Sequence, residues 1–369
     1  MWKFYQPVDI VFGAGKVEKL AEIMEEKKLD KALIVADPFT EKCGLAKKVM
    51  DMSKGKVVGI ISEVEPNPSI QNVDACIAKA KETGAECIIA IGGGSAMDCA
   101  KSTAAGCKMN LCGSELLAGA AVTSALPVIA VPTTAGTGSE VTAGAVISDK
   151  EKGIKAAVFS PAIFPVLAVV DPELTYTCPP AVTASSGIDV LAHALDALTS
   201  VKASPATDAL AVRAAKMVFE NLEKAYLDGN DKAARDNMSE ACVTAGLAFS
   251  QTGTTGSHAC SYILTSKFGI PHGEACAFTL DSWFRENAKV RPQLNEFAKM
   301  MGFSDADEAA DEVAKLRDKL KLRSRLSEIG VTEADLDEIA KSSNASGNMT
   351  NNIAKIGVDG IRRLFAEKA

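Results

Sequence analysis

The hydrophobic pattern of this 369-residue chain changes near residue 175, and that change limits the folds it can adopt. Before it, short runs rich in β-branched residues alternate with helical segments such as 16–27 and 70–83. The runs occupy residues 32–36, 57–61, 87–92, 127–132 and 167–171. Strands that alternate with helices form a mostly parallel sheet covered by helices. We therefore predict an α/β domain over 1–176, which the glycine-rich segments described below mark as a dinucleotide-binding domain.

Beyond residue 175 the strand signal almost disappears. Long alanine-rich amphipathic stretches follow one another at about 180–200, 205–226, 230–249, 305–321 and 332–343. A Gly/Ser/Asn-rich segment at 342–352 predicts a loop before a last short helix. This pattern predicts an all-α C-terminal domain over 177–369, which the histidines described below mark as metal-binding.

Composition limits the partners of the chain. The net charge is −7 and 24% of residues are charged, without an acidic or basic block, so we expect no nucleic-acid and no membrane partner. The N-terminus has no continuous apolar h-region, and no stretch reaches about 18 uninterrupted apolar residues. Ten scattered cysteines without a CxxC pair fit the reducing cytoplasm.

The three histidines of the chain are candidate metal ligands. Asp189 and His193 are spaced i, i+4 in an apolar helical run, which places them on one helix face. His258 and His272 flank a helix break at 269–271, so they can converge from consecutive helices. One carboxylate and three imidazoles suit Fe(II), Zn or Ni. Each histidine taken singly is explained as well by ordinary packing.

Two glycine-rich segments follow predicted strands. Residues 92–95 run from a buried strand straight into a helix, where backbone N–H groups can bind a phosphate. Residues 131–140 supply small hydroxyl side chains after another strand. Either segment is also consistent with a tight turn. Asp37 ends a third strand, where a carboxylate can bind an adenosine ribose or cap a helix.

Together these motifs resemble the iron-containing (group III) alcohol dehydrogenases, whose fold includes glycerol dehydrogenase and dehydroquinate synthase. The resemblance covers nearly the whole chain. Its motifs are FGAG at 12–15, VEPNP at 64–68, GGGSAMDCAK at 92–101, PTTAGTGSE at 132–140, K-x4-SP at 155–161, AVVDPELT at 168–175, GIDVLAHALDA at 187–197 and GIPHGEACA at 269–277.

The resemblance implies a set of site residues. Asp189, His193, His258 and His272 would bind Fe(II) or, in some relatives, Zn. NAD(H) is favoured over NADP(H), because an aspartate at position 37 disfavours the 2′-phosphate. The implied cofactor residues are Asp37, Asn67, Gly93, Gly94, Ser95, Asp98, Thr133, Thr134, Thr137, Ser139 and Lys155.

One position departs from the family pattern. Relatives such as lactaldehyde reductase have a further histidine four residues after the first of the 14-residue pair, where this chain has Tyr262. Tyrosine, with an unperturbed pKa near 10, relays protons only if its pKa is lowered or through a hydroxyl chain. Tyr262 and Lys155 are the candidate catalytic residues. Phe249, Tyr262 and Trp283 are candidate substrate walls, and helix packing explains each equally well.

The predicted function is hydride transfer between NAD(H) and a small alcohol or aldehyde bound to Fe(II), by a cytoplasmic homodimer that uses the N-terminal strand near Phe4–Phe12. The alternatives are a zinc polyol dehydrogenase of the glycerol type, dehydroquinate synthase, and a non-catalytic nucleotide- and metal-binding module. A reductase of an anionic aldehyde such as phosphonoacetaldehyde or sulfoacetaldehyde is a further alternative, with Arg285 and Lys267 either as the anion site or as solvated surface charges.

Overall fold

The computed structural model describes residues 1–369, which divide into two compact units. The sheet unit comprises Gln6–Thr134 and Gly138–Thr175. The helical unit comprises Met1–Tyr5, Ala135–Thr137 and Tyr176–Ala369. The main change of unit thus falls where the hydrophobic pattern changes, after residue 175.

The sheet unit contains a six-stranded parallel sheet of order β1-β8-β5-β4-β2-β3. Its strands are β1 (Asp9–Phe12), β2 (Ala32–Ala36), β3 (Val57–Ile61), β4 (Cys87–Gly92), β5 (Val128–Pro132) and β8 (Leu167–Val170). All five predicted strand runs are confirmed. An antiparallel pair, β6 (Gly144–Asp149) and β7 (Ile154–Phe159), was not predicted, because its mixed residues show neither a buried run nor a clean alternation.

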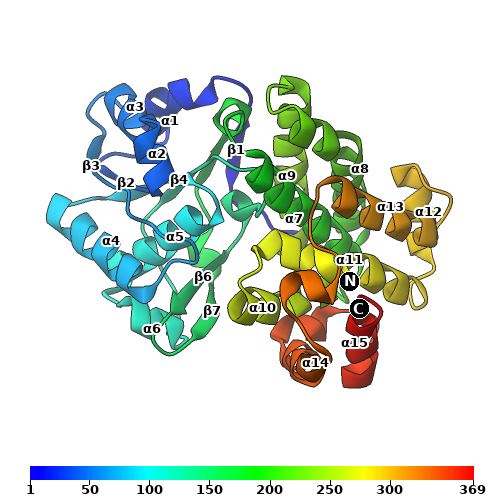
Figure 1. Cartoon of the computed structure of the whole chain (residues 1–369). Helices are drawn as coiled ribbons and strands as arrows, with labels where there is room; N and C mark the ends of the chain where they lie inside the picture. The colour runs from blue at the N-terminus through cyan, green and yellow to red at the C-terminus, as the bar shows by residue number, and fades with distance from the viewer. The chain divides into compact units, whose positions relative to one another are not determined.

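Helices cover both faces of this sheet (Figure 1). Leu33 and Ile88 point to the core formed with α4 (Ile70–Thr83) and α5 (Gly94–Met109). Ile34 and Ile89, one residue further along, point to the opposite core, which α1 (Leu20–Glu26) and α3 (Leu45–Met52) close. The alternation follows from the two-residue period of a strand. The predicted parallel sheet covered by helices is therefore confirmed.

The helical unit holds nine α-helices packed around two cores. They are α7 (Pro180–Leu198), α8 (Pro205–Leu227), α9 (Lys232–Thr252), α10 (Gly256–Phe268), α11 (His272–Ala288), α12 (Gln293–Met301), α13 (Ala306–Lys319), α14 (Leu336–Ala345) and α15 (Gly357–Ala366). Helix α11 contributes to both cores, one shared with α7–α9 and the other with α10, α14 and α15.

The predicted loop at 342–352 is partly wrong. Helix α14 continues to Ala345, and a 3₁₀ helix follows at Gly347–Asn351. Ser343 and Asn352 are completely buried, and Asn352 exchanges side-chain hydrogen bonds with Asn287 of α11. Tertiary contacts therefore override a composition that is typical of a loop.

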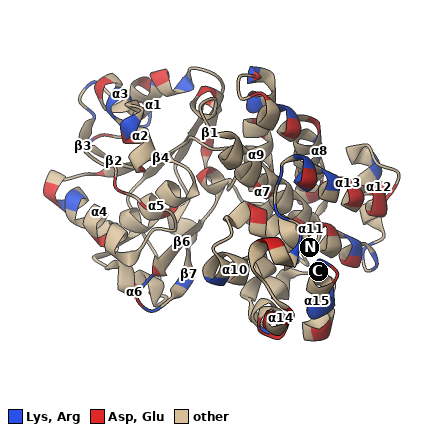
Figure 2. Ribbon diagram, in the orientation of Figure 1, with Lys and Arg blue, Asp and Glu red and all other residues tan.

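Charge is distributed without a single-sign patch along the outer helices. Figure 2 shows Lys and Arg mixed with Asp and Glu on helices such as α13 and α15. None of the helices combines the length and the apolar character needed to span a bilayer.

Candidate functional site

Helix α7 supplies two of the predicted ligands. Asp189 and His193 lie one turn apart on its buried face, with Asp189 Oδ2 3.9 Å from His193 Nδ1. The ring of Phe249 stacks on His193, with the ring centroids 4.1 Å apart. This aromatic contact fixes the imidazole plane and makes one wall of the cluster.

The other two histidines converge on the same place from consecutive helices. His258 lies on α10, which ends with Gly269 in the left-handed conformation, and His272 is the first residue of α11. The His258 ring centroid is 4.6 Å from that of His193 and 5.4 Å from that of His272. His258 Nε2 lies 3.6 Å from Asp189 Oδ1. The four side chains therefore form one cluster, in which His272 is half-buried and the other three are buried.

Gly273 makes this convergence possible. A Cβ atom at this position would lie 1.9 Å from the carbonyl oxygen of Ser185 and 2.9 Å from Asp189 Cβ, both on α7. Only glycine permits so close an approach of α11 to α7, because any side chain would collide with backbone. The residue beside His272 thus sets its distance from Asp189.

Several polar atoms of the cluster are buried without a hydrogen bond. They are Asp189 Oδ1, His193 Nδ1 and His258 Nε2. An unsatisfied buried polar atom costs about 1–3 kcal/mol, so three that face one another require an explanation. A divalent cation among them would supply the missing interactions, and carboxylate and imidazole donors are those that Fe and Zn accept. The cluster therefore fits a metal ion.

The protonation states of Asp189 and His193 suit that interpretation. Burial lowers the pKa of His193 to about 4, so its imidazole is neutral at pH 7 and keeps a lone pair for a metal. Burial opposes ionisation of Asp189, but the neighbouring imidazoles, His193 foremost, hold its pKa below the ordinary value. The cluster thus presents a carboxylate beside a neutral imidazole. Although burial opposes it, Cys276 and Asp189 instead raise the pKa values of His258 and His272, so a metal would have to displace their protons.

Asp196 orients His258 and was missed in the sequence. Nδ1 of His258 donates to Asp196 Oδ2 at 2.8 Å, which turns Nε2 toward Asp189. Thr255 N and Ser257 Oγ also donate to the Asp196 carboxylate. Burial opposes its ionisation, but His258 lowers the pKa of Asp196. Its spacing, three residues after His193 on the same helix face, was the available signal.

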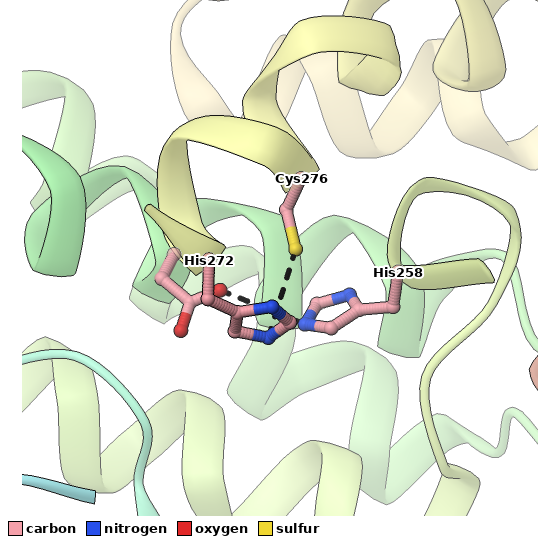
Figure 3. Close-up of side chains that lie close together, drawn as sticks. His258, His272 and Cys276 are labelled. Carbon is pink, nitrogen blue, oxygen red and sulfur yellow. Dashed lines mark hydrogen bonds and ion pairs between the residues drawn. The ribbon is translucent and has the colours of Figure 1, made fainter. Parts of the chain in front are cut away.

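A cysteine also belongs to the cluster and was missed. Cys276 lies one turn after His272 on α11, and its Sγ is 3.8 Å from His272 Nε2. Figure 3 shows the sulfur and the His272 ring directed toward one another beside His258. Donor atoms of Asp189, His258, His272 and Cys276 all lie within 4.8 Å of one another. Although burial opposes it, the two histidines lower the pKa of the thiol.

Tyr262 lies at the edge of the cluster. Its ring stacks parallel to His272 with centroids 6.4 Å apart, and its hydroxyl accepts a hydrogen bond from Asn348 Nδ2 at 2.9 Å. Burial among protein atoms raises the pKa of the phenol, although the residue keeps 38% of its surface exposed. Trp283, another candidate wall, is buried and donates to Cys260 Sγ, so it belongs to the core.

The first glycine-rich segment joins β4 directly to α5. Strand β4 ends at Gly92, Gly93 is the N-cap, and no side chain caps the helix. Gly92 has φ 148°, and a Cβ there would lie 2.7 Å from Asp37 Oδ2. The N–H groups of the first turn of α5, which includes Gly94 and Ser95, are therefore available to an anion.

Asp37 is a helix N-cap that also lies beside the first glycine-rich segment. Its Oδ1 accepts from Thr40 N at 2.9 Å, so it is the N-cap of the short helix α2 (Pro38–Lys42). Its Oδ2 lies against Gly92, at the glycine-rich segment. The carboxylate is thus placed at the carboxyl ends of β2 and β4, where nucleotides bind in open parallel sheets.

The second glycine-rich segment lies beside the first. Thr133 N donates to Gly92 O at 3.0 Å, and Thr134 Oγ1 would be 3.1 Å from a Cβ at Gly93. Both threonines are thus next to the N-terminus of α5. Thr137 falls in Ala135–Thr137, which belongs to the helical unit.

A buried lysine ties this second segment to α5 and was also missed. Lys101 is completely buried. Its Nζ lies within hydrogen-bond distance of the carbonyl oxygens of Ser139, Thr142 and Gly144 and of the hydroxyls of Ser139 and Thr142. Ser139 Oγ in turn donates to Asp98 Oδ1 at 3.2 Å. The signal was a lysine spaced i, i+3 from Asp98 in a helix that is otherwise alanine-rich.

Asn67, Ser95 and Lys155 also come together. Asn67, in the left-handed conformation with φ 53°, donates from its backbone N to Ser95 Oγ at 3.1 Å. Lys155 Nζ donates to Asn67 Oδ1 at 2.8 Å. The predicted cofactor residues of the sheet unit therefore gather around the start of α5.

The two cations considered for an anionic substrate have other partners. Arg285 binds the carboxylates of Asp307 and Asp311, and Lys267 binds those of Asp335 and Glu338. These partners offset both charges.

A parallel sheet with a glycine-rich phosphate loop, joined in one chain to helices that bear a carboxylate–imidazole cluster, is the architecture of a metal-dependent dehydrogenase. The family model of the iron-containing alcohol dehydrogenases matches residues 7–172, and that of the C-terminal part of the same family matches 183–369. The chain belongs to the iron-containing alcohol dehydrogenase family, and it is an oxidoreductase.

Individual relatives are similar over two thirds of their length or more. Alcohol dehydrogenase 4 of Saccharomyces cerevisiae is 36% identical over 349 residues, 92% of this chain and 91% of the relative. A 1-propanol dehydrogenase of Salmonella typhimurium is 40% identical over 70% of this chain and 67% of its own. The crystal structure of sulfoacetaldehyde reductase from Bifidobacterium kashiwanohense in complex with NAD+ is 38% identical, with a TM-score of 0.95 over 100% of this chain and 99% of that one.

Proposed function

We propose that this chain is a metal-dependent alcohol dehydrogenase that transfers hydride between NAD(H) and a small alcohol or aldehyde. The observation that carries the proposal is the buried cluster in which Asp189 Oδ1, His193 Nδ1 and His258 Nε2 face one another without hydrogen bonds. Asp189, His193, His258 and His272 would hold the ion, with Fe(II) the first candidate and Zn the second. When bound, such an ion polarises a carbonyl oxygen and stabilises the charge that develops on it.

The residues around the cluster keep it in a state ready to bind. Asp196 holds the proton on His258 Nδ1, so Nε2 keeps its lone pair. Phe249 stacks on His193 and excludes water from that side of the cluster. Burial strengthens every electrostatic interaction within it.

The cofactor residues are assigned by their positions around α5. Gly93, Gly94 and Ser95 would present backbone N–H groups to the diphosphate, with Thr133 and Thr134 beside them. The remaining assignments are Asp98 of α5, Thr137 and Ser139 of the second glycine-rich segment, and Asn67 with Lys155 near the nicotinamide end.

The preference for NAD over NADP rests on Asp37, because its carboxylate would repel a 2′-phosphate. Asp37→Ser keeps a good helix N-cap but removes the charge. We expect this variant to gain at least about tenfold in kcat/KM with NADPH relative to NADH, corresponding to about 1.4 kcal/mol. An unchanged ratio would remove Asp37 from cofactor choice.

Tyr262 and Lys155 complete the proposed machinery. Because Asn348 already donates to the Tyr262 oxygen, the phenolic proton can be donated to a substrate oxygen. The raised pKa keeps that proton in place at neutral pH, so Tyr262 acts as a hydrogen-bond donor rather than as a titrating acid. Lys155 would act through Asn67, which it holds by a hydrogen bond.

The proposed substrates are small uncharged alcohols and aldehydes. A second candidate, an anionic aldehyde, is favoured by the similarity to a sulfoacetaldehyde reductase. The pairing of Arg285 and Lys267 with carboxylates favours the uncharged class.

The deciding experiment is NADH oxidation by protein reconstituted anaerobically with Fe(II) or with Zn(II), across neutral and anionic short aldehydes. The metal content is measured on wild type and on His258→Ala. We expect turnover that depends on the metal and is lost in the variant. Metal and NADH both bound without turnover of any aldehyde would refute the proposal.

We also propose that this protein acts as a cytoplasmic homodimer. Strand β1 is an edge of the sheet, and its last residue, Phe12, is 36% exposed. An edge strand invites pairing with a second copy. The ten free cysteines fit a reducing compartment. Light scattering at two protein concentrations tests the dimer, and a single monomeric mass would refute it.

A further inference from the structure

Cys276 occupies an unusual position for a buried thiol. It is completely buried on α11, one turn after His272, and its sulfur points to His272 Nε2 at 3.8 Å (Figure 3). The other ring nitrogen, Nδ1, lies 3.4 Å from Ser261 Oγ. The imidazole nitrogen that faces the sulfur is therefore Nε2, which is also the nitrogen that would bind a metal.

Comparison with Cys260 shows that packing alone does not account for this position. Cys260 is also completely buried, in the same half of the chain, but its sulfur accepts a hydrogen bond from Trp283 Nε1 at 3.4 Å. Cys260 is thus part of the core, whereas Cys276 faces a cluster of potential ligands that includes Asp189 and His258.

A second observation points independently to an ion at this place. Asp189 Oδ1 and His258 Nε2 have no hydrogen-bond partner, and they are 3.6 Å apart, which is beyond a good hydrogen bond. Asp189 and His258 are each 3% exposed, so water does not compensate them from outside. Both atoms belong to the group of four donors that includes the Cys276 sulfur.

The distances are those of ligands around one ion. Zinc binds sulfur at about 2.3 Å and imidazole nitrogen at about 2.0–2.1 Å, which in a tetrahedron separates the two donors by ~3.6 Å. The observed separation of Cys276 Sγ from His272 Nε2 is 3.8 Å. The 4.8 Å limit on all four donors requires only small side-chain movements.

We propose that the sulfur of Cys276 is a further ligand of the metal ion, beside the aspartate and the histidines. On binding, a metal–sulfur bond forms and the thiol proton leaves to solvent. A soft sulfur donor favours Zn(II) and Co(II) over Fe(II) relative to an oxygen and nitrogen set. The inference rests on the proposed function, since it assumes that the cluster binds a metal.

The test uses the full chain loaded stoichiometrically with Zn(II) or Co(II). In wild type we expect one sulfur at about 2.3 Å in zinc X-ray absorption and a sulfur-to-cobalt charge-transfer band in the near ultraviolet. Both signals should disappear in Cys276→Ser, and its zinc affinity should fall at least about tenfold. Cys260→Ser, which removes a buried thiol outside the cluster, should keep both signals.

The outcomes separate the two ideas. Bound metal with only nitrogen and oxygen neighbours in wild type overturns the role of Cys276 and leaves the proposed dehydrogenase intact. Failure of wild type to bind Zn(II), Co(II) or Fe(II) overturns both. The wild-type spectra decide the matter even if Cys276→Ser does not fold.

Discussion

The two units bury their polar groups in opposite ways. In the sheet unit the Lys101 ammonium is completely buried, and its three N–H groups are shared among five oxygens of Ser139, Thr142 and Gly144 within hydrogen-bond distance. In the helical unit Asp189 and His258 are almost as deeply buried, yet each leaves a donor or acceptor atom unpaired. The first network is complete by itself, whereas the second is completed only by something added to it.

This difference separates groups that hold the fold from groups that wait for a ligand. A satisfied buried network stabilises the chain and is damaged by losing a member. An unsatisfied cluster is a cost to the chain without its ligand. Mutations in the two places should therefore affect different measurements.

The largest expected effect is that of Asp189→Asn on turnover. Removing the only carboxylate among the predicted ligands should abolish stoichiometric metal binding and lower kcat/KM by roughly 10³-fold, equivalent to about 4 kcal/mol. The metal-free variant should unfold within about 1 kcal/mol of metal-free wild type, because its carboxylate is not part of a complete network. A strongly destabilised apo variant with normal metal binding would reverse the comparison.

Lys101→Met should have the reverse effect. It removes the buried cation that the oxygens of Ser139, Thr142 and Gly144 surround and leaves Asp98 without its nearby cation, which should lower the free energy of unfolding by about 3–5 kcal/mol. Urea unfolding measures this change, and metal content should stay stoichiometric. The matched control is Lys79→Met, which removes an exposed partner of Glu82 and should change stability by less than about 0.5 kcal/mol.

A pH dependence sharpens the same contrast. Burial raises the pKa of Asp98 to about 6, from an ordinary value of 3.8, so the folded chain binds this proton more tightly than the unfolded chain. Its contribution to stability is therefore complete below pH 3.8 and is lost as the pH rises through about 6. Between pH 4 and 6 the ionisation of Asp98 should lower the free energy of unfolding of wild type by up to about 3 kcal/mol, and Asp98→Asn should remove this decrease. Equal slopes in both proteins would disprove it.

The smallest effect is predicted for Tyr262→Phe. Loss of one hydrogen bond to substrate should lower kcat/KM by about two- to tenfold, that is by about 0.5–1.5 kcal/mol. The pH profile should keep its shape, because the hydroxyl does not titrate near neutral pH. Tyr262→His is the informative partner, since it should add a new limb near the ordinary pKa of histidine. A lost alkaline limb in Tyr262→Phe would make the phenol a true proton relay.

The fold could be predicted closely because its signals are local. Each main strand is a short buried run, and the breaks at Gly84 and Gly269 coincide with left-handed residues that end α4 and α10. The pair β6 and β7 could not be predicted, since its register depends on the lysine and hydroxyl contacts of α5. The 342–352 segment misled because its burial depends on distant α11.

The site could be predicted only where the residue type is informative by itself. Histidines are few, so the cluster of three was visible. Asp196, Lys101 and Cys276 are ordinary in sequence, and their importance arises from what they face across helices. Local spacing gave a signal for each, but spacing alone does not distinguish a buried partner from a solvated one.

The missing side chain at Gly273 has a consequence for which ions fit. Backbone contact between α11 and α7 at this residue fixes the distance between His272 and Asp189. The distance between the two helices cannot change to fit a larger or smaller ion, so only rotation of the imidazoles and of the Cys276 side chain can adjust the site. The metal site should therefore select divalent ions by radius, binding those near the size of zinc and excluding calcium.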